Sequence, residues 1–159
     1  MSHEIEVITD GEHNTSTTMW LITEAYKGSE PNKSVIAAEI MFWTYYTGGH
    51  LDPAGRKYTE VIISDRVWEV WYQSDWEDKS GINDNKWIYI SFKAKNPSLK
   101  AGIPGFELLN YAIQEGLISR DLYIADIELG NEIMSGSGIT WVKEFNVDYE
   151  EKSKQITVR

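Results

Sequence analysis

The sequence predicts an all-β protein, a jelly-roll β-sandwich that carries one α-helix. Most of the chain consists of short segments rich in β-branched and aromatic residues, turn signals separate these segments, and only one segment has a helical period. Many short strands with regular turns are typical of sandwiches and jelly rolls. At 159 residues the chain is long enough for one full core, so we expect residues 1–159 to form a single domain.

Seven segments have the composition of strands, and they cover residues 17–26, 35–46, 58–64, 67–73, 86–94, 121–128 and 139–148. The turn signals between them, rich in Gly, Pro, Asn, Asp and Ser, lie at 28–33, 47–56, 74–85 and 135–138. The order of these segments predicts a mainly antiparallel sandwich.

The helical period occurs in residues 104–118. Apolar side chains recur there at helical spacing and would form one stripe that packs against a sheet: Phe106, Leu109, Ile113 and Leu117. Gly116 lies near the end of the segment, where we expect the chain to reverse.

Composition excludes several classes of function. The formal charge is −10 and no basic cluster is present, which argues against nucleic acid or an anionic membrane as the partner and favours a neutral or cationic substrate. Cysteine is absent, and no HExxH, GxxxxGK or GxGxxG pattern occurs, so we expect neither a metal nor an organic cofactor. No apolar run approaches the length of a membrane span, and residues 1–16 are too polar for a signal peptide.

Aromatic residues make up 13% of the chain, with seven Trp and nine Tyr. Aromatic faces are suited to stacking on sugar rings, but the same residues are good strand formers and could simply fill a core. Composition leaves both interpretations open.

The segment AEIMFW, residues 38–43, contains one carboxylate inside an otherwise apolar strand. Because side chains alternate along a strand, one face carries only core residues, namely Ile36, Ala38, Ile40 and Phe42. The other face carries Glu39, Met41, Trp43 and Tyr45, a mixture that suits the floor of a cleft.

A second group of carboxylates lies in residues 126–138. Alternation places Asp126, Glu128 and Glu132 on one face, and Gly130 permits a close backbone approach. Two carboxylates on facing strands of one groove are the parts of a glycosidase. Solvated strand carboxylates are also common, so the pattern by itself leaves both interpretations open.

Together these motifs resemble glycoside hydrolase family 12, the small endo-β-1,4-glucanases and xyloglucanases. The resembling segments follow one another in order from about residue 35 to residue 147: EIMFW at 39–43, GGHLDPAG with Pro53 and Gly55, VWEVWY at 67–72, YISF at 89–92, LLNYAIQEGLI at 108–118, YIADIELGNE at 123–132 and ITWVKEFNV at 139–147.

The resemblance implies a concanavalin-like jelly roll with a concave substrate cleft, and a retaining enzyme that cuts internal β-1,4 bonds of cellulose-type or mixed-linkage β-glucan. Glu39 matches the nucleophile and is expected to be ionised. Glu132 matches the acid/base and is expected to have a raised affinity for its proton. The resemblance implies supporting or substrate-lining places for Met41, Trp43 and Glu128, and further candidates for the aromatic surface are Tyr45, Trp71 and Trp87.

The family resemblance also implies a β-glucan partner, a monomer without cofactors, and secretion. Since residues 1–16 are not a signal peptide, a trimmed leader and a cytoplasmic location both stay open. Family members usually carry more strands before the nucleophile than the 38 residues that precede Glu39 here. They also place a supporting Asp on the preceding strand, and the matching position in this chain is expected to be Leu21.

Two other hypotheses compete with the enzyme. One is a non-catalytic carbohydrate-binding sandwich of the same fold. The other is a structural domain in which Glu39 pairs with Lys143 or Arg66. The acidic segment 74–85 could bind calcium, but it lacks the EF-hand spacing, so a solvated turn is the expectation there.

Overall fold

The computed structural model describes residues 1–24, 36–48, 51–77 and 85–149. In this part of the chain, nine strands form two sheets and one helix packs against them. The six-stranded sheet has the order β4 (Arg56–Ile63), β5 (Arg66–Glu77), β6 (Lys86–Ala94), β3 (Ile36–Tyr46), β2 (Glu12–Ile22) and β8 (Tyr123–Ser135). The three-stranded sheet has the order β7 (Lys100–Gly102), β1 (Ser2–Thr9) and β9 (Gly138–Asn146). The all-β jelly-roll sandwich with one helix is confirmed.

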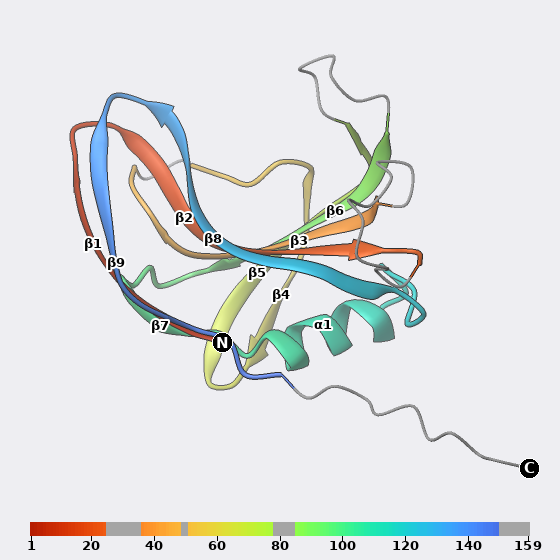
Figure 1. The fold of residues 1–159 in the computed structure, drawn as a ribbon. Coiled ribbons are helices and arrows are strands. Elements are labelled where there is room, and N and C mark those ends of the chain that lie inside the picture. Colours follow the sequence, from red (N-terminus) through yellow and green to blue (C-terminus); the bar gives the residue numbers. More distant parts are fainter. Residues whose placement is uncertain (25–35, 49–50, 78–84, 150–159) are drawn as a thin grey trace, which may run out of the picture.

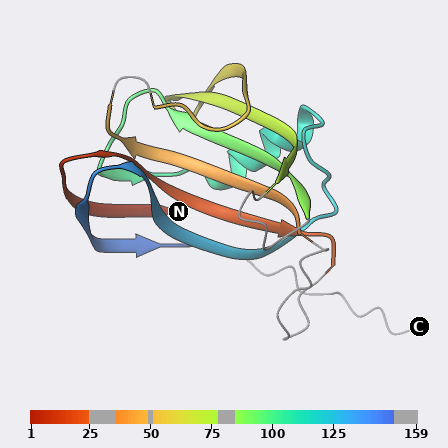
Figure 2. The same ribbon diagram turned by 90° about the horizontal axis from the view of Figure 1, so that it is seen from above.

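The helix α1 (Gly105–Gln114) and the three-stranded sheet lie on the same side of the six-stranded sheet (Figure 1). On that side, His3 Nε2 of β1 lies 2.7 Å from Thr44 Oγ1 of β3 and joins the two sheets. The view from above shows the six strands side by side, with α1 behind them (Figure 2). The opposite face of the six-stranded sheet is therefore free of helix in the described part of the chain.

Each of the seven predicted strands corresponds to an observed one, with shifted ends. The turn expected at 74–85 begins later than predicted, because β5 continues to Glu77. All pairings in the sheets are antiparallel except that of β3 with β6, which is parallel.

Two strands, β1 and β7, were not predicted. In β1, buried His3 and Ile5 alternate with Glu4 and Glu6, so the segment has the period of a strand, but Glu is not a residue typical of strands. Its place is set by pairing with β9, which lies about 140 residues away in the sequence and gives no local signal.

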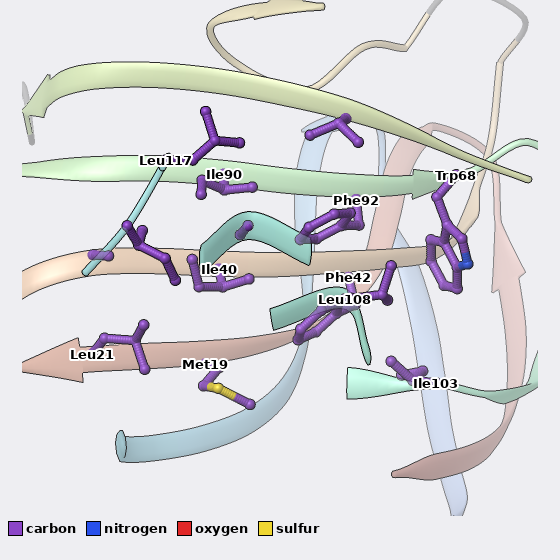
Figure 3. Close-up of a cluster of buried hydrophobic side chains, with 14 of the residues drawn as sticks. Met19, Leu21, Ile40, Phe42, Trp68, Ile90, Phe92, Ile103, Leu108 and Leu117 are labelled. Atoms are coloured by element: carbon purple, nitrogen blue, oxygen red, sulfur yellow. The ribbon is translucent and has the colours of Figure 1, made fainter. Parts of the chain in front are cut away.

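The core lies between the six-stranded sheet and α1 (Figure 3). Ala38, Ile40 and Phe42 of β3 are each 0% exposed, as the predicted core face requires. Around them pack buried side chains from every side of this layer: Met19, Leu21, Trp68, Val70, Ile90, Phe92, Ile103, Leu108, Ala112, Leu117 and Ile118.

The helix buries a different stripe from the one predicted. Leu108 and Ala112 face the sheet and are fully buried, whereas Phe106 is 75% exposed. Two residues of an α-helix turn the side chain through about 200°, so Phe106 points away when Leu108 points inward. Leu109 and Ile113 pack at the margin of the core, and Leu117 is buried after the helix has ended.

The chain reverses at Gly116, as predicted. This residue has a φ of +71°, in the left-handed region that favours glycine. The Leu117 N–H donates to the Ala112 carbonyl at 2.9 Å, which satisfies one of the free carbonyls at the helix end. This reversal directs Leu117 and Ile118 into the core.

In the described residues, β8 and β9 form the ends of their sheets, since β8 pairs with β2 and β9 pairs with β1. A turn at 135–138 joins the two strands, as predicted. Ile133, Ile139 and Val142 on these strands are more than half exposed. Among the described residues, no helix is long and apolar enough to cross a membrane.

The position of the core predicts the effects of two helix substitutions. Leu108→Ala should lower the free energy of unfolding by about 2–5 kcal/mol, because it leaves a cavity beneath the sheet. Phe106→Ala is the control and should change it by less than about 0.5 kcal/mol, because that ring is in solvent. Urea unfolding monitored by circular dichroism measures both, and equal losses would contradict the observed orientation of α1.

Candidate active site

The helix-free face of the six-stranded sheet carries the predicted carboxylates, and we call it the carboxylate face. Side chains of paired residues point to the same side of a sheet, so the register defines this face. Glu39 of β3 pairs with Trp20 of β2 and with Tyr89 of β6. The face is lined by Asn14, Ser16, Thr18 and Trp20 of β2, by Glu39, Met41 and Trp43 of β3, by Trp71 and Gln73 of β5, by Trp87, Tyr89, Ser91 and Lys93 of β6, and by Asp126, Glu128, Gly130 and Glu132 of β8.

Glu39 is held in a largely desolvated position. The Nε1–H of Trp87 donates to its Oε2 at 3.0 Å. Burial raises the pKa of Glu39 to about 7, the Trp87 hydrogen bond acts in the opposite direction, and the charges of Glu132 and Glu128 raise it further. A carboxylate of this kind exchanges its proton near neutral pH.

Glu132 lies on an exposed part of β8, where the side chain of Asn14 on β2 donates to it. Its charge acts on Glu39 and also, together with burial, raises the pKa of Tyr89. Glu128 and Gly130 share its face, as the alternation predicted. The structure therefore brings Glu39, Glu128 and Glu132 into one electrostatically coupled group.

The protonation of Glu39 differs from the expectation. The sequence resemblance implied an ionised Glu39, whereas burial raises the pKa of this carboxyl group to about 7. The cause is position, because Glu39 lies on a central strand of the sheet between Trp20 and Tyr89.

Met41 and Trp43 lie on the carboxylate face but are only 4% and 1% exposed. They cluster with Tyr89, whose hydroxyl donates to Met41 Sδ at 3.3 Å. The segment 51–55 covers this cluster with Leu51 and Ala54. Met41 and Trp43 thus form the base of the site rather than an open stacking surface.

Lys93 holds the covering segment 51–55 in place. Its Nζ donates to the Leu51 carbonyl at 2.6 Å and to Asp52 at 2.9 Å, and it lies 4.5 Å from the ring centre of Tyr46. Gly55 ends the segment with a φ of +83°, and a Cβ there would lie 2.6 Å from the Tyr72 carbonyl oxygen. These contacts fix the segment over Met41 and Trp43.

The remaining aromatic candidates occupy three different environments. Trp87 is 7% exposed and directly contacts Glu39. Trp71 is partly exposed on β5, opposite Ser91. The prediction that Tyr45 shares the face of Glu39 was wrong. The register of β3 with β2 shifts after Trp43, so Tyr45 pairs with Thr15 and lies on the opposite face, where its ring centre is 5.8 Å from that of His13.

The expectation for Leu21 was wrong. Leu21 is 2% exposed and points into the core, since it pairs with the core residue Ala38. The residue of β2 that pairs with Glu39 is Trp20. The sequence argument was displaced by one residue, and such a displacement moves a side chain to the opposite face of a strand.

The predicted ion pairs of Glu39 are also absent from the described residues. Lys143 pairs with Glu6 at 2.9 Å, and Arg66 donates to the Asn96 carbonyl while lying over the ring of Trp68. The charge of Glu39 is thus met by an indole N–H rather than by a cation. Residues 78–84 of the calcium candidate segment lie outside the described residues.

The sequence argument missed three residues that contact the site, Trp20, Asn14 and Trp76. Trp20 pairs with Glu39, and Asn14 contacts Glu132. Trp76 pairs with Trp87, and its ring centre lies 5.4 Å from that of Tyr89 in a tilted contact. Alternation could have grouped Trp20 with Thr18. Only the register, which depends on pairing between distant strands, assigns it to Glu39.

A cavity of about 150 Å³ lies apart from the carboxylates, where β1 and β9 bend over β2 and β8. It is lined by Val7, Thr9, His13, Asn131, Ile133, Ser137, Gly138, Ile139 and Thr140. Burial lowers the pKa of His13. The cavity shares no lining residue with the group around Glu39.

Comparison with known proteins gives one consistent result. The model of glycosyl hydrolase family 12 matches residues 3–150. Endoglucanase S from Pectobacterium parmentieri is 27% identical over 144 residues, which cover 87% of this chain and 49% of that protein. The chain thus spans about half the length of this curated relative.

Solved structures share the fold. A family 12 xyloglucanase from Bacillus licheniformis, in complex with ligand, matches with a TM-score of 0.78 and 20% identity over 91% of this chain and 59% of that one. An endoglucanase from Rhodothermus marinus matches with a TM-score of 0.67 and 23% identity over 91% of this chain and 61% of that one.

The electrostatics of Glu39 predict a pH-dependent effect on stability. The folded pKa of about 7 exceeds the ordinary value of 4.5, so the folded state holds a proton that the unfolded state releases, and stability falls as pH rises between these values. Glu39→Gln removes this cost and should raise the free energy of unfolding by up to about 3 kcal/mol at pH 8, with little change at pH 4.

The measurement is urea unfolding at both pH values, with Glu107→Gln on the exposed side of α1 as the matched control. A Glu39→Gln effect of the same size at pH 4 and pH 8 would mean that burial of the charge is not its cause.

Proposed function

The chain belongs to glycosyl hydrolase family 12, and from this premise we propose that it is an endo-acting glycosidase of β-1,4-linked glucans. The proposed substrates are cellulose-type and mixed-linkage β-glucans. The observation that carries the proposal is the coupling of Glu39 and Glu132 on one helix-free face of the sheet. Paired carboxylates are the chemical requirement for glycoside hydrolysis.

In the proposed mechanism the configuration at the anomeric carbon is retained. The Glu39 carboxylate attacks the anomeric carbon while Glu132 transfers its proton to the departing glycosidic oxygen, so one C–O bond forms as the other breaks. Water then attacks the glycosyl-enzyme ester, Glu132 takes a proton from this water, and Glu39 leaves as a carboxylate. This chemistry needs no metal or organic cofactor.

The environment of Glu39 supports its role as nucleophile, but Glu39 can attack only in its ionised form. The Trp87 N–H orients Oε2, and burial removes much of the water from around the attacking carboxylate. Because burial raises the pKa of Glu39 to about 7, only part of the population is ionised at neutral pH. The approach of a positively charged transition state at the anomeric carbon would favour the ionised form.

The aromatic side chains support recognition of an uncharged polysaccharide. Trp71 and Trp87 lie on the carboxylate face beside Glu39 and Met41, and Trp20 adds a third, partly exposed indole there. The formal charge of −10 disfavours polyanionic partners. We infer an extracellular site of action from the insoluble or large polymers that such enzymes degrade.

The first test replaces each carboxylate. Glu39→Gln and Glu132→Gln should each lower hydrolysis of barley β-glucan at least about 100-fold, because each removes a group that takes part in bond cleavage. Reducing-end release measures this loss, and circular dichroism verifies the fold. Glucan binding without any release of reducing ends by the unsubstituted protein would instead favour the carbohydrate-binding sandwich.

A second test assigns the two roles. With azide and an aryl β-cellobioside that has an activated leaving group, Glu39→Ala should yield the α-glycosyl azide, because azide then attacks in place of the missing nucleophile. Glu132→Ala should yield the β-glycosyl azide, since Glu39 still forms the intermediate. The reverse pattern would exchange the roles of the two residues.

The pH profile gives an independent test. In Glu132→Ala, with an activated aryl β-cellobioside that needs no proton donor, kcat/KM reports only the attack by Glu39. It should rise with pH along an acid limb whose midpoint lies near 7 or somewhat below, since the negative charge of Glu132 is removed as well. A profile without this rise would contradict attack by an ionised Glu39. The profile is measured at constant ionic strength.

A further inference from the structure

Two tryptophans and a carboxylate form a continuous chain of contacts that ends at Glu39. Glu128 Oε1 on β8 accepts a hydrogen bond from Trp20 Nε1–H on β2 at 2.9 Å. The ring of Trp20 meets the ring of Trp87 edge to face, with 5.8 Å between centres and 67° between planes. Trp87 Nε1–H then donates to Glu39 Oε2 at 3.0 Å.

The sheet register explains how this chain can span three strands. Trp20 pairs with Glu39 across β2 and β3, while Thr18 pairs with Glu128 across β2 and β8. On β8 the residue opposite Trp20 is Asp126, and Glu128 is the next residue on the same face. The Glu128 carboxylate therefore lies within reach of the Trp20 indole. The contacts cross from the end strand to the centre of the sheet on one face.

The direction of the Trp87 N–H depends on the orientation of its ring. Trp87 is 7% exposed, and Trp20 provides one of the surfaces against which its ring rests. Trp20 is itself only partly buried, so its orientation depends on the hydrogen bond to Glu128. An edge-to-face pair is worth about 0.5–1.5 kcal/mol beyond burial, enough to select one ring orientation.

We propose that Trp20 and Glu128 are positioning residues for Glu39: Glu128 fixes Trp20, Trp20 fixes Trp87, and the Trp87 N–H aims the carboxylate. This inference rests on the proposed function, in which Glu39 is the nucleophile. It gives Glu128 a task that does not involve contact with the reacting atoms.

The charged and titratable groups around Glu39 determine how each substitution can change the pKa of Glu39. Glu132 and Glu128 act on it from β8, and Tyr89 lies beside it on β6. Trp20 carries no charge. On replacing Trp20, loss of the Trp87 hydrogen bond raises the pKa of Glu39, whereas water admitted beside the carboxylate lowers it, so the direction of the change identifies its cause.

The kinetic test compares single and double variants. Trp20→Ala and Glu128→Ala should each lower kcat about 10-fold with a smaller change in KM, because the carboxylate is misaligned. Trp20→Phe keeps an aromatic ring, though a smaller one, and removes the indole N–H, so Glu128→Ala added to Trp20→Phe should lower kcat by less than about twofold further. Multiplicative losses in the double variant would overturn the proposal.

The pH profile separates positioning from general damage to the fold. In the Glu132→Ala background with the activated aryl substrate, Trp20→Ala should move the acid limb of kcat/KM upward, in the same direction as Trp87→Phe, which removes the donor outright. Trp141→Phe, on β9 and remote from these contacts, is the matched control and should leave the limb in place. An unmoved or lowered limb in Trp20→Ala would contradict the proposal.

A spectroscopic test does not require activity. In ¹H–¹⁵N spectra, the Trp87 indole signal, identified by its loss in Trp87→Phe, should titrate with Glu39 and stop titrating in Glu39→Gln. It should move upfield in Trp20→Ala and in Glu128→Ala, and less in Glu128→Gln, where an amide oxygen can still accept.

The activity measurements and the spectroscopic test together distinguish failure of the proposed function from failure of the positioning role. If the protein hydrolyses no glucan but the signal behaves as described, the proposed function fails and the positioning contacts stand. If hydrolysis is observed and the signal is unchanged in both Trp20→Ala and Glu128→Ala, the positioning role fails and the enzyme stands.

Discussion

The alternation of side chains along β3 is the constraint on which the rest of the structure depends. This strand lies inside the six-stranded sheet, paired with β6 on one edge and with β2 on the other, and one of its faces packs against the core. One face must be apolar, and Ala38, Ile40 and Phe42 make it so. The other holds Glu39 above a base of Met41 and Trp43. The carboxylate is therefore desolvated by its position in the sheet, and its raised pKa is a consequence of the same packing that stabilises the fold.

The local period allowed much of this to be predicted. The two faces of residues 36–43 and the common face of Glu128 and Glu132 follow from alternation, which needs no tertiary information. The predictions were wrong where pairing between distant strands decides which face a side chain occupies. Trp20 and Leu21 are neighbours on opposite faces, and only the register with β3 shows which one meets Glu39. Likewise β1 became a strand because β9 pairs with it.

Burial explains why residues of similar expected role differ in the structure. Trp43 and Trp87 lie on one face, yet Trp43 is covered by the segment that Lys93 anchors, while Trp87 is aimed at Glu39. Composition could not distinguish a buried packing residue such as Trp43 from a residue that contacts Glu39, such as Trp87, since both are large aromatic side chains. The difference arises from residues 51–55, whose conformation depends on Gly55 and on contacts across three strands.

The partner of Glu39 also determines what the site can do. A cation would hold the carboxylate ionised at all working pH values, whereas an indole N–H orients it without supplying a full charge. Burial raises the pKa of Glu39 to about 7 and the nearby charges of Glu132 and Glu128 add to this effect, so the free protein retains a protonated fraction of Glu39 near neutrality. The ionised form is favoured once positive charge develops opposite it. Stabilisation of Glu39 is thus greatest when the reacting sugar bears that charge, which is the condition for catalysis rather than for tight binding alone.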